Sequence, residues 1–173
     1  MTRRSITILA GATTLVLGAL AAAGCGSSGG SNANGSSAVP RTANGQSATV
    51  GIANESLGKI LVNSQGRTLY IFQRDSGTKS ACTDACAIEW PPLRATGKPV
   101  VGGGANPSIV ATSARSDGKP QVTYSGHPLY LFTGDQKPGD TNGQGVNAFG
   151  GLWYALSSAG SQIVSAPNPS LGY

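Results

Sequence analysis

The sequence predicts an all-β fold, an antiparallel sandwich or barrel-like domain built from two homologous β repeats. "GRTLYIFQRD" at residues 66–75 and "GHPLYLFTGD" at residues 126–135 carry Gly, Leu, Tyr, Phe and Asp at the same places. The match extends without a gap over residues 49–75 and 109–135, where ten of the twenty-seven positions are identical. Such a register indicates an internal duplication, because chance rarely aligns so long a stretch without insertions.

Each repeat is predicted to form about three strands. Residues 49–53 and 109–113 provide the first strand of each copy. The β-branched and aromatic runs on either side of residues 64–66 and 125–126 predict a hairpin, with glycine supplying the turn conformation. Residues 151–158 add a final strand, and helical periodicity is nearly absent.

The strand inside the repeated stretch is apolar on both faces. Leu69 and Ile71 point one way and Tyr70 and Phe72 point the other, because side chains alternate along a strand. The second copy keeps this pattern. We therefore expect both strands to be covered on both sides, with each tyrosine hydroxyl bonded to a partner.

The repeated aspartates, Asp75 and Asp135, stand where these strands end. Strand alternation places each of them on the Leu face rather than on the Tyr face. One interpretation is that each carboxylate accepts backbone N–H groups and shapes the following turn. The other is that the two carboxylates contact a ligand or a cation.

The N-terminus predicts an export signal. Arg3 and Arg4 precede an apolar run without charge, and small residues lead to Cys25, which is typical of a signal peptide over residues 1–24. The alternative is a transmembrane helix, since the run is nearly long enough to span a bilayer. The abrupt end at Ala-Ala-Gly-Cys favours cleavage.

That ending also resembles a bacterial lipobox, which implies lipidation of Cys25. Two acyl chains, such as palmitate, are enough for stable anchoring. Residues 25–48 are mostly Gly, Ser, Asn and Ala and predict a flexible tether, and residues 49–173 then form a single β domain. The expected location is the outer face of the cell membrane.

The two other cysteines, Cys82 and Cys86, are predicted to form a disulfide, because exported proteins meet an oxidising environment. A metal or redox pair is the alternative, although zinc needs four ligands and His127 is the only histidine. The same segment, residues 83–90, predicts one short helical turn that ends at Pro91.

The loop over residues 139–151 resembles the first half of a calcium-binding loop. Oxygen-bearing side chains stand at alternate positions before a glycine, at Asp140, Asn142 and Gln144, and Asp135 lies close enough in sequence to complete an oxygen cage. The alternative is a Gly-rich loop whose polar side chains bind its own backbone. His127, in a hairpin turn, is expected either at the surface without a role or in a metal or haem site.

Charge and aromatic residues limit the choice of partner. Removing Arg3 and Arg4 with the leader leaves ten of the twelve basic residues against seven acidic ones. This small and scattered positive net charge argues against nucleic acid as a partner. The aromatic residues of the repeats are expected in the core, or else on an open face where they would stack on a glycan or a flat ligand.

The repeated motif has the form Tyr-x-aromatic-x-x-Asp and resembles bacterial predicted lipoproteins defined by that pattern, called the secreted repeat of unknown function. The motif residues are Tyr70, Phe72, Asp75, Tyr130, Phe132 and Asp135. The resemblance also includes "ACTDACAIEWPPL" and "GDTNGQGVNAFGGLWYAL". It implies an exported, often lipid-anchored β-rich domain and brings no established activity.

These observations favour a lipid-anchored envelope protein that serves as a non-catalytic binding or structural module for an unidentified envelope ligand or protein. An enzyme is not expected, because nucleophilic catalysis would have to be built around a single histidine and no Gly-x-Ser-x-Gly is present. No cofactor is expected, with calcium as the one candidate. The alternative function is a metal- or redox-handling envelope accessory.

Overall fold

The computed structural model describes residues 49–164. The predicted signal peptide over residues 1–24, the lipidated Cys25 and the tether over residues 25–48 lie outside the described residues. Within the described range, no helix has the length and apolar character needed to cross a membrane.

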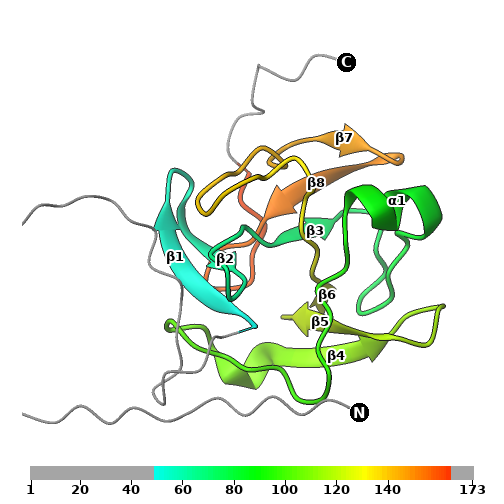
Figure 1. Cartoon of the computed structure of the whole chain (residues 1–173), viewed down its shortest axis with the longest axis horizontal. Helices are drawn as coiled ribbons and strands as arrows, with labels where there is room; N and C mark the ends of the chain where they lie inside the picture. Colours follow the sequence, from blue (N-terminus) through cyan, green and yellow to red (C-terminus); the bar gives the residue numbers. More distant parts are fainter. Residues whose placement is uncertain (1–48, 165–173) are drawn as a thin grey trace, which may run out of the picture. The chain divides into compact units, whose positions relative to one another are not determined.

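The described residues form short antiparallel strands in three sheets (Figure 1). The first sheet is β1-β2, the second is β3-β8-β7, and the third is β4-β5-β6. The strands are β1 (Gly51–Glu55), β2 (Gly58–Val62), β3 (Tyr70–Phe72), β4 (Val110–Ala114), β5 (Pro120–Tyr124), β6 (His127–Pro128), β7 (Asn147–Ala148) and β8 (Gly151–Ala155). The predicted all-β antiparallel class is confirmed, and over residues 49–164 the strands do not close into a barrel.

In residues 49–164, helical structure is limited to short pieces. The helix α1 (Asp84–Glu89) lies within the predicted residues 83–90 and contains Cys86, and it ends at Trp90 directly before two prolines. A single 3₁₀ turn, η1 (Pro107–Ile109), begins with proline after the capping residue Asn106, whose side chain accepts the N–H of Ser108 at 3.0 Å. The sequence analysis did not anticipate η1.

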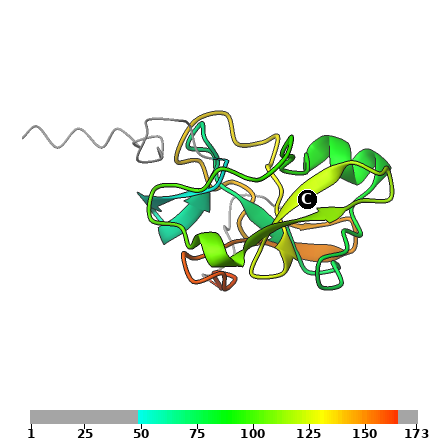
Figure 2. The same ribbon diagram turned by 90° about the horizontal axis from the view of Figure 1, so that it is seen from below.

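The two repeats exchange the segments that follow them. Strand β3 of the first repeat pairs with β8, which follows the second repeat. The motif strand of the second repeat lies along residues 91–93, which follow the first repeat, through Leu131 N to Pro91 O and Leu93 N to Leu129 O bonds of 2.9 and 2.8 Å. In Figure 2, β4-β5-β6 lies in front of β7 and β8. Because each motif strand pairs with a segment that follows the other repeat, neither half is complete without the other.

The gapless alignment hides a shift of one residue in the hairpins. Leu69 N donates to Leu61 O at 3.0 Å, whereas Leu129 N donates to Val122 O at 3.0 Å, so Val122 occupies the place of Leu61. Both belong to the same core cluster, while Val62 packs in a different one. The identical pair Val62 and Val122 is thus not structurally equivalent, because the first hairpin turn holds one more residue.

The motif strands separate two hydrophobic clusters, as their alternation predicted. Leu69 and Ile71 belong to one cluster and Tyr70 and Phe72 to the other, and all four are buried. The second copy divides its side chains in the same way. These strands are central because covering both faces removes apolar surface from water twice.

The predicted disulfide between Cys82 and Cys86 is present, with a Cα–Cα distance of 5.3 Å. Both cysteines are buried against the cluster that contains Tyr70 and Phe72. The disulfide therefore fixes α1 and the following Trp90 against this cluster.

Replacing both cysteines by alanine should lower the free energy of unfolding by about 2 kcal/mol, because the bridge closes a very small ring and removes little chain entropy. Urea denaturation of the variant and of the wild type measures the difference. Thiol titration of the native exported protein should find neither Cys82 nor Cys86 free. Two free thiols in that titration would contradict the bridge.

Candidate functional site

The two copies of the motif bind each other in a crossed arrangement. The hydroxyl of Tyr70 donates to Asp135 Oδ2 at 2.8 Å, and the hydroxyl of Tyr130 donates to Asp75 Oδ2 at 2.9 Å. The backbones of the two tyrosines also exchange N–H to carbonyl bonds, each 2.9 Å long. Each tyrosine thus pairs with the aspartate of the other repeat and with the backbone of the other tyrosine.

The aspartates reach these positions because the chain turns immediately after each motif strand. Asp75 N donates to Phe72 O at 3.1 Å, and Asp135 N donates to Phe132 O at 3.2 Å. The prediction that strand alternation would place both aspartates on the Leu face is wrong. Alternation holds only while the strand continues, and β3 ends at Phe72.

The second oxygen of each carboxylate binds a backbone N–H farther along the chain. Asp75 Oδ1 accepts from Ala81 N at 2.8 Å, and Asp135 Oδ1 accepts from Asn142 N at 2.9 Å. Each aspartate therefore closes the loop that follows its own strand and at the same time binds the opposite tyrosine. One carboxylate performs both tasks because it has two acceptor oxygens.

Burial dominates the electrostatics of both pairs. It raises the pKa of Asp75 to about 6, although the bonds from Ala81 N and Tyr130 and the charge of Arg115 oppose the shift. It likewise raises the pKa of Asp135 to about 6, against the bonds from Tyr70 and Asn142. Burial and the neighbouring carboxylates also raise the pKa of both tyrosines.

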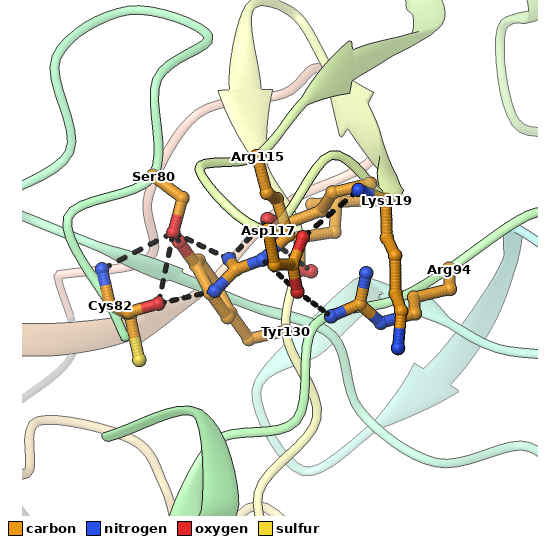
Figure 3. Close-up of polar contacts among 9 residues, drawn as sticks. Ser80, Cys82, Arg94, Arg115, Asp117, Lys119 and Tyr130 are labelled. Atoms are coloured by element: carbon orange, nitrogen blue, oxygen red, sulfur yellow. Dashed lines mark hydrogen bonds and ion pairs between the residues drawn. The ribbon is translucent and has the colours of Figure 1, made fainter. Parts of the chain in front are cut away.

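The pair formed by Tyr130 and Asp75 extends into a polar network around a buried arginine (Figure 3). Arg115 Nη1 donates to Ser80 Oγ at 2.6 Å, and Nη2 donates to the carbonyl oxygen of Cys82 at 2.6 Å. Ser80 Oγ lies 2.7 Å from the Tyr130 hydroxyl. The network joins the β4–β5 turn to the disulfide segment and to the motif tyrosine.

An exposed ion pair borders this network. Arg94 Nη2 donates to Asp117 Oδ2 at 2.8 Å, and Arg115 Nε lies 3.8 Å from the same oxygen. The N–H of Lys119 and then Arg94 lower the pKa of Asp117. Since the ion pair is solvent-exposed, its contribution to stability is small.

The opposite pair has different neighbours. The Tyr70 hydroxyl accepts the N–H of Gly143 at 3.2 Å, and a Cβ added at Gly143 would lie 2.8 Å from the Tyr70 ring. Arg67 Nη2 donates to Phe132 O at 2.6 Å. Here a backbone N–H and an arginine bonded to a carbonyl replace the Ser80 and Arg115 network, so the duplicated motif has two unlike surroundings.

The aromatic side chains of the motif lie in a stack of four rings. Phe72 stacks on Trp153, Trp153 on Trp90, and Trp90 on Phe132, with ring centroids 4.2, 3.9 and 4.2 Å apart. The rings of Tyr70 and Tyr130 stand nearly perpendicular to those of Trp90 and Trp153, with centroid distances of 5.5 and 5.1 Å. All six rings are buried, which supports the expected core and not an open stacking platform.

The loop that resembles part of a calcium-binding loop makes its contacts with the protein itself. Asp140 Oδ2 accepts the N–H groups of Gln136 and Lys137, and Gln144 Oε1 accepts that of Ala155. In residues 49–164, no group of three or more His, Cys, Asp or Glu side chains is placed to hold a metal ion. A calcium site here would need amide and backbone oxygens, so calcium stays a candidate raised by the loop pattern alone.

His127 lies at the surface at the start of β6, and Asn142 is exposed in the calcium-like loop, where its side chain donates to Gly134 O at 3.2 Å. Neither is joined to the crossed pairs by its side chain in the described contacts. Sequence analysis did not single out Ser80 and Arg115. Arg115 aligns with Glu55 of the first copy, and this difference in charge was the only available signal.

A comparison of the sequence with known protein families gives a match. The chain matches the family model described as "secreted repeat of unknown function" over residues 51–94 and 111–157, just over half of its length. The protein belongs to this family. In the secreted repeat, each matched segment extends past the motif aspartate and includes one of the stacked tryptophans, Trp90 or Trp153. No curated protein and no solved structure shows a significant match.

The crossed hydrogen bonds predict coupling between particular residues. Tyr70→Phe should cost about 1–3 kcal/mol, because it leaves a buried carboxylate oxygen without its donor. In double-mutant cycles, Tyr70→Phe should couple to Asp135→Asn and not to Asp75→Asn, whereas Tyr130→Phe should show the reverse. Denaturant unfolding of the single and double variants measures each coupling. Equal coupling in both combinations would contradict the crossed pairing of each tyrosine with the aspartate of the other repeat.

Protonation of the two aspartates predicts how stability changes with pH. Their pKa is about 6 in the fold and ordinarily 3.8, so the folded state binds more protons between these values. The unfolding free energy should therefore be highest near pH 4 and fall as pH rises to about 6 or 7. Thermal unfolding across this range measures the effect.

The double variant Asp75→Asn/Asp135→Asn should lose most of this pH dependence. Asp84→Asn, which replaces an exposed carboxylate, should keep it. A double variant that retains the full dependence would show that other groups cause it.

Proposed function

We propose that the protein is a lipid-anchored, outward-facing module of the cell envelope with a non-catalytic binding or structural role. The observation that supports this best is the use of the motif inside the fold. Both tyrosine hydroxyls and both carboxylates bind each other, and both phenylalanines stack on tryptophans. The pattern that defines the repeat thus stabilises the domain, and its side chains are engaged with one another.

Membership of a family of secreted repeats supports a location outside the cytoplasm. The proposed location at the membrane rests on the sequence. Cys25 follows a charge-free apolar run, and a lipidated cysteine there would carry enough acyl chain for stable anchoring. Residues 26–48 would then let the β domain stand away from the membrane surface.

A ligand or partner protein would have to contact surface outside the crossed pairs. The exposed positions at which the two copies differ are the best candidates, among them His127 and the loop that carries Asp140 and Asn142. Calcium would bind at the same loop. Calorimetry with calcium added to chelator-treated protein tests this, and the absence of heat would remove calcium from the proposal.

The alternative role is a metal- or redox-handling accessory. Cys82 and Cys86 bind each other and are buried, so exchange with an outside thiol would first require local opening. Elemental analysis and the visible spectrum of the native protein distinguish the two roles. Bound metal or visible absorbance would favour the accessory over the binding module.

Cys25→Ala tests the lipid anchor. The wild type should incorporate a palmitate analogue and have the mass of a chain that begins at Cys25, whereas the variant should stay unlabelled and keep residues 1–24. Labelling in gel and mass spectrometry of the intact protein provide the two measurements. Cys82→Ala/Cys86→Ala serves as the control, because it should remain labelled. Label on the Cys25 variant would refute anchoring at this residue.

A further inference from the structure

Four oxidisable rings form a continuous chain through the aromatic cluster. Tyr70 lies nearly perpendicular to Trp90 at a centroid distance of 5.5 Å, and Trp90 stacks on Trp153 at 3.9 Å with 8° between planes. Trp153 lies nearly perpendicular to Tyr130 at 5.1 Å. All four residues have a relative exposure of 0%. Phenylalanines, which resist oxidation, cover both outer faces of the tryptophan pair.

A base stands at each end of this chain. Tyr70 and Tyr130 donate to carboxylates, whereas Tyr124, which is also buried, donates to the neutral carbonyl of Ser158 at 2.9 Å. A neutral acceptor is thus sufficient to hold a buried tyrosine in this fold. A carboxylate in such a place is costly to bury unless it is well paired, and yet the arrangement occurs twice.

The neighbours of Tyr130 fix the direction of its proton. A guanidinium cannot accept, so Arg115 donates to Ser80 Oγ, and an ionised carboxylate cannot donate, so Tyr130 gives its only proton to Asp75. The Tyr130 oxygen also lies 2.7 Å from Ser80 Oγ. Arg115, Ser80, Tyr130 and Asp75 therefore form one connected series of polar contacts.

We propose that Tyr70, Trp90, Trp153 and Tyr130 form a path for one-electron oxidation, with Asp135 and Asp75 as proton acceptors. A strong one-electron oxidant outside the cytoplasm removes one electron from the path. Tyr130 transfers its hydroxyl proton to Asp75 and becomes a neutral tyrosyl radical. Asp75 becomes a carboxylic acid, and the oxidant is reduced by one electron.

The arrangement suits this chemistry in three respects. A phenol loses an electron far more readily when a base takes its proton in the same step, and the two carboxylates are positioned for this transfer. The two stacked indoles share π overlap, so an electron vacancy can move between the ends. The surrounding cluster excludes water, which protects a radical from side reactions. None of these points depends on the lipid anchor or on a ligand.

Photochemical oxidation tests the path directly. The protein is mixed with a ruthenium trisbipyridyl complex, and a laser flash with an electron-accepting quencher generates the one-electron oxidant. The background variant Tyr124→Phe/Tyr154→Phe/Tyr173→Phe leaves Tyr70 and Tyr130 as the only tyrosines. Transient absorption and electron paramagnetic resonance should detect a neutral tyrosyl radical in this background.

Removing the proton acceptors should separate the proposal from a merely structural role. In the same background, Asp75→Asn/Asp135→Asn should slow formation of the tyrosyl radical by about a hundredfold, the lower end of what a positioned base contributes. An indole radical should accumulate in its place. Trp90→Phe and Trp153→Phe, which keep an aromatic ring in the stack, should each lower the yield of tyrosyl radical.

Folding is checked for each variant by its thermal midpoint and near-ultraviolet circular dichroism. If the aspartate variants do not fold, the background protein alone provides the test. Its radical formation should slow as pH falls from 8 to 5, because each carboxylate has a pKa of about 6 and loses its ability to accept a proton. A rate that is independent of pH, or an unchanged rate in folded aspartate variants, would overturn the proposal.

Discussion

The crossed pairs between tyrosine hydroxyls and aspartates are the interaction on which the rest of the structure depends. Tyr70 bonds to Asp135, 65 residues away, and Tyr130 bonds to Asp75, 55 residues away. Because each bond joins one repeat to the other, neither repeat can satisfy its own motif. The same carboxylates also fix the loops that follow the motif strands. The motif therefore sets the relation between the halves and the course of both loops.

The crossed pairs contain carboxylates, which are costly to bury. Desolvation raises the pKa of Asp75 and Asp135, which means that the fold holds their charges at a cost. In return, a buried carboxylate accepts only well-placed donors, and so it specifies one partner more strictly than an apolar contact does. The stacked Trp90 and Trp153 contribute apolar burial at the same place. Directional bonds and aromatic packing thus act on one interface.

Duplication left the motif intact and allowed its surroundings to diverge. Near Tyr130, Ser80 comes from the segment that follows the first repeat, and the β4–β5 turn contributes the buried Arg115. Near Tyr70, the close approach of Gly143 serves instead, and only a residue without a Cβ leaves room for the tyrosine ring. The two tyrosine–aspartate pairs are alike in themselves, but different side chains and backbone groups surround each pair.

The sequence alone determined what depends on local periodicity and chemistry. The duplication, the antiparallel β class, the two-faced strand that contains Tyr70 and Phe72, and the disulfide of Cys82 and Cys86 were all predicted, because alternation, turn residues and cysteine count act within short stretches. Side-chain burial on both faces followed from the same alternation.

Only the tertiary structure decided which groups meet. The aspartates were misplaced because strand alternation stops at the turn after Phe72, and Val122 was wrongly matched to Val62 because one extra turn residue reverses the face of a strand. The crossing of the pairs is invisible in a sequence, since a repeated motif looks the same whether each copy binds itself or the other. Contacts between distant residues are set by how the sheets pack, and packing is a property of the whole folded chain.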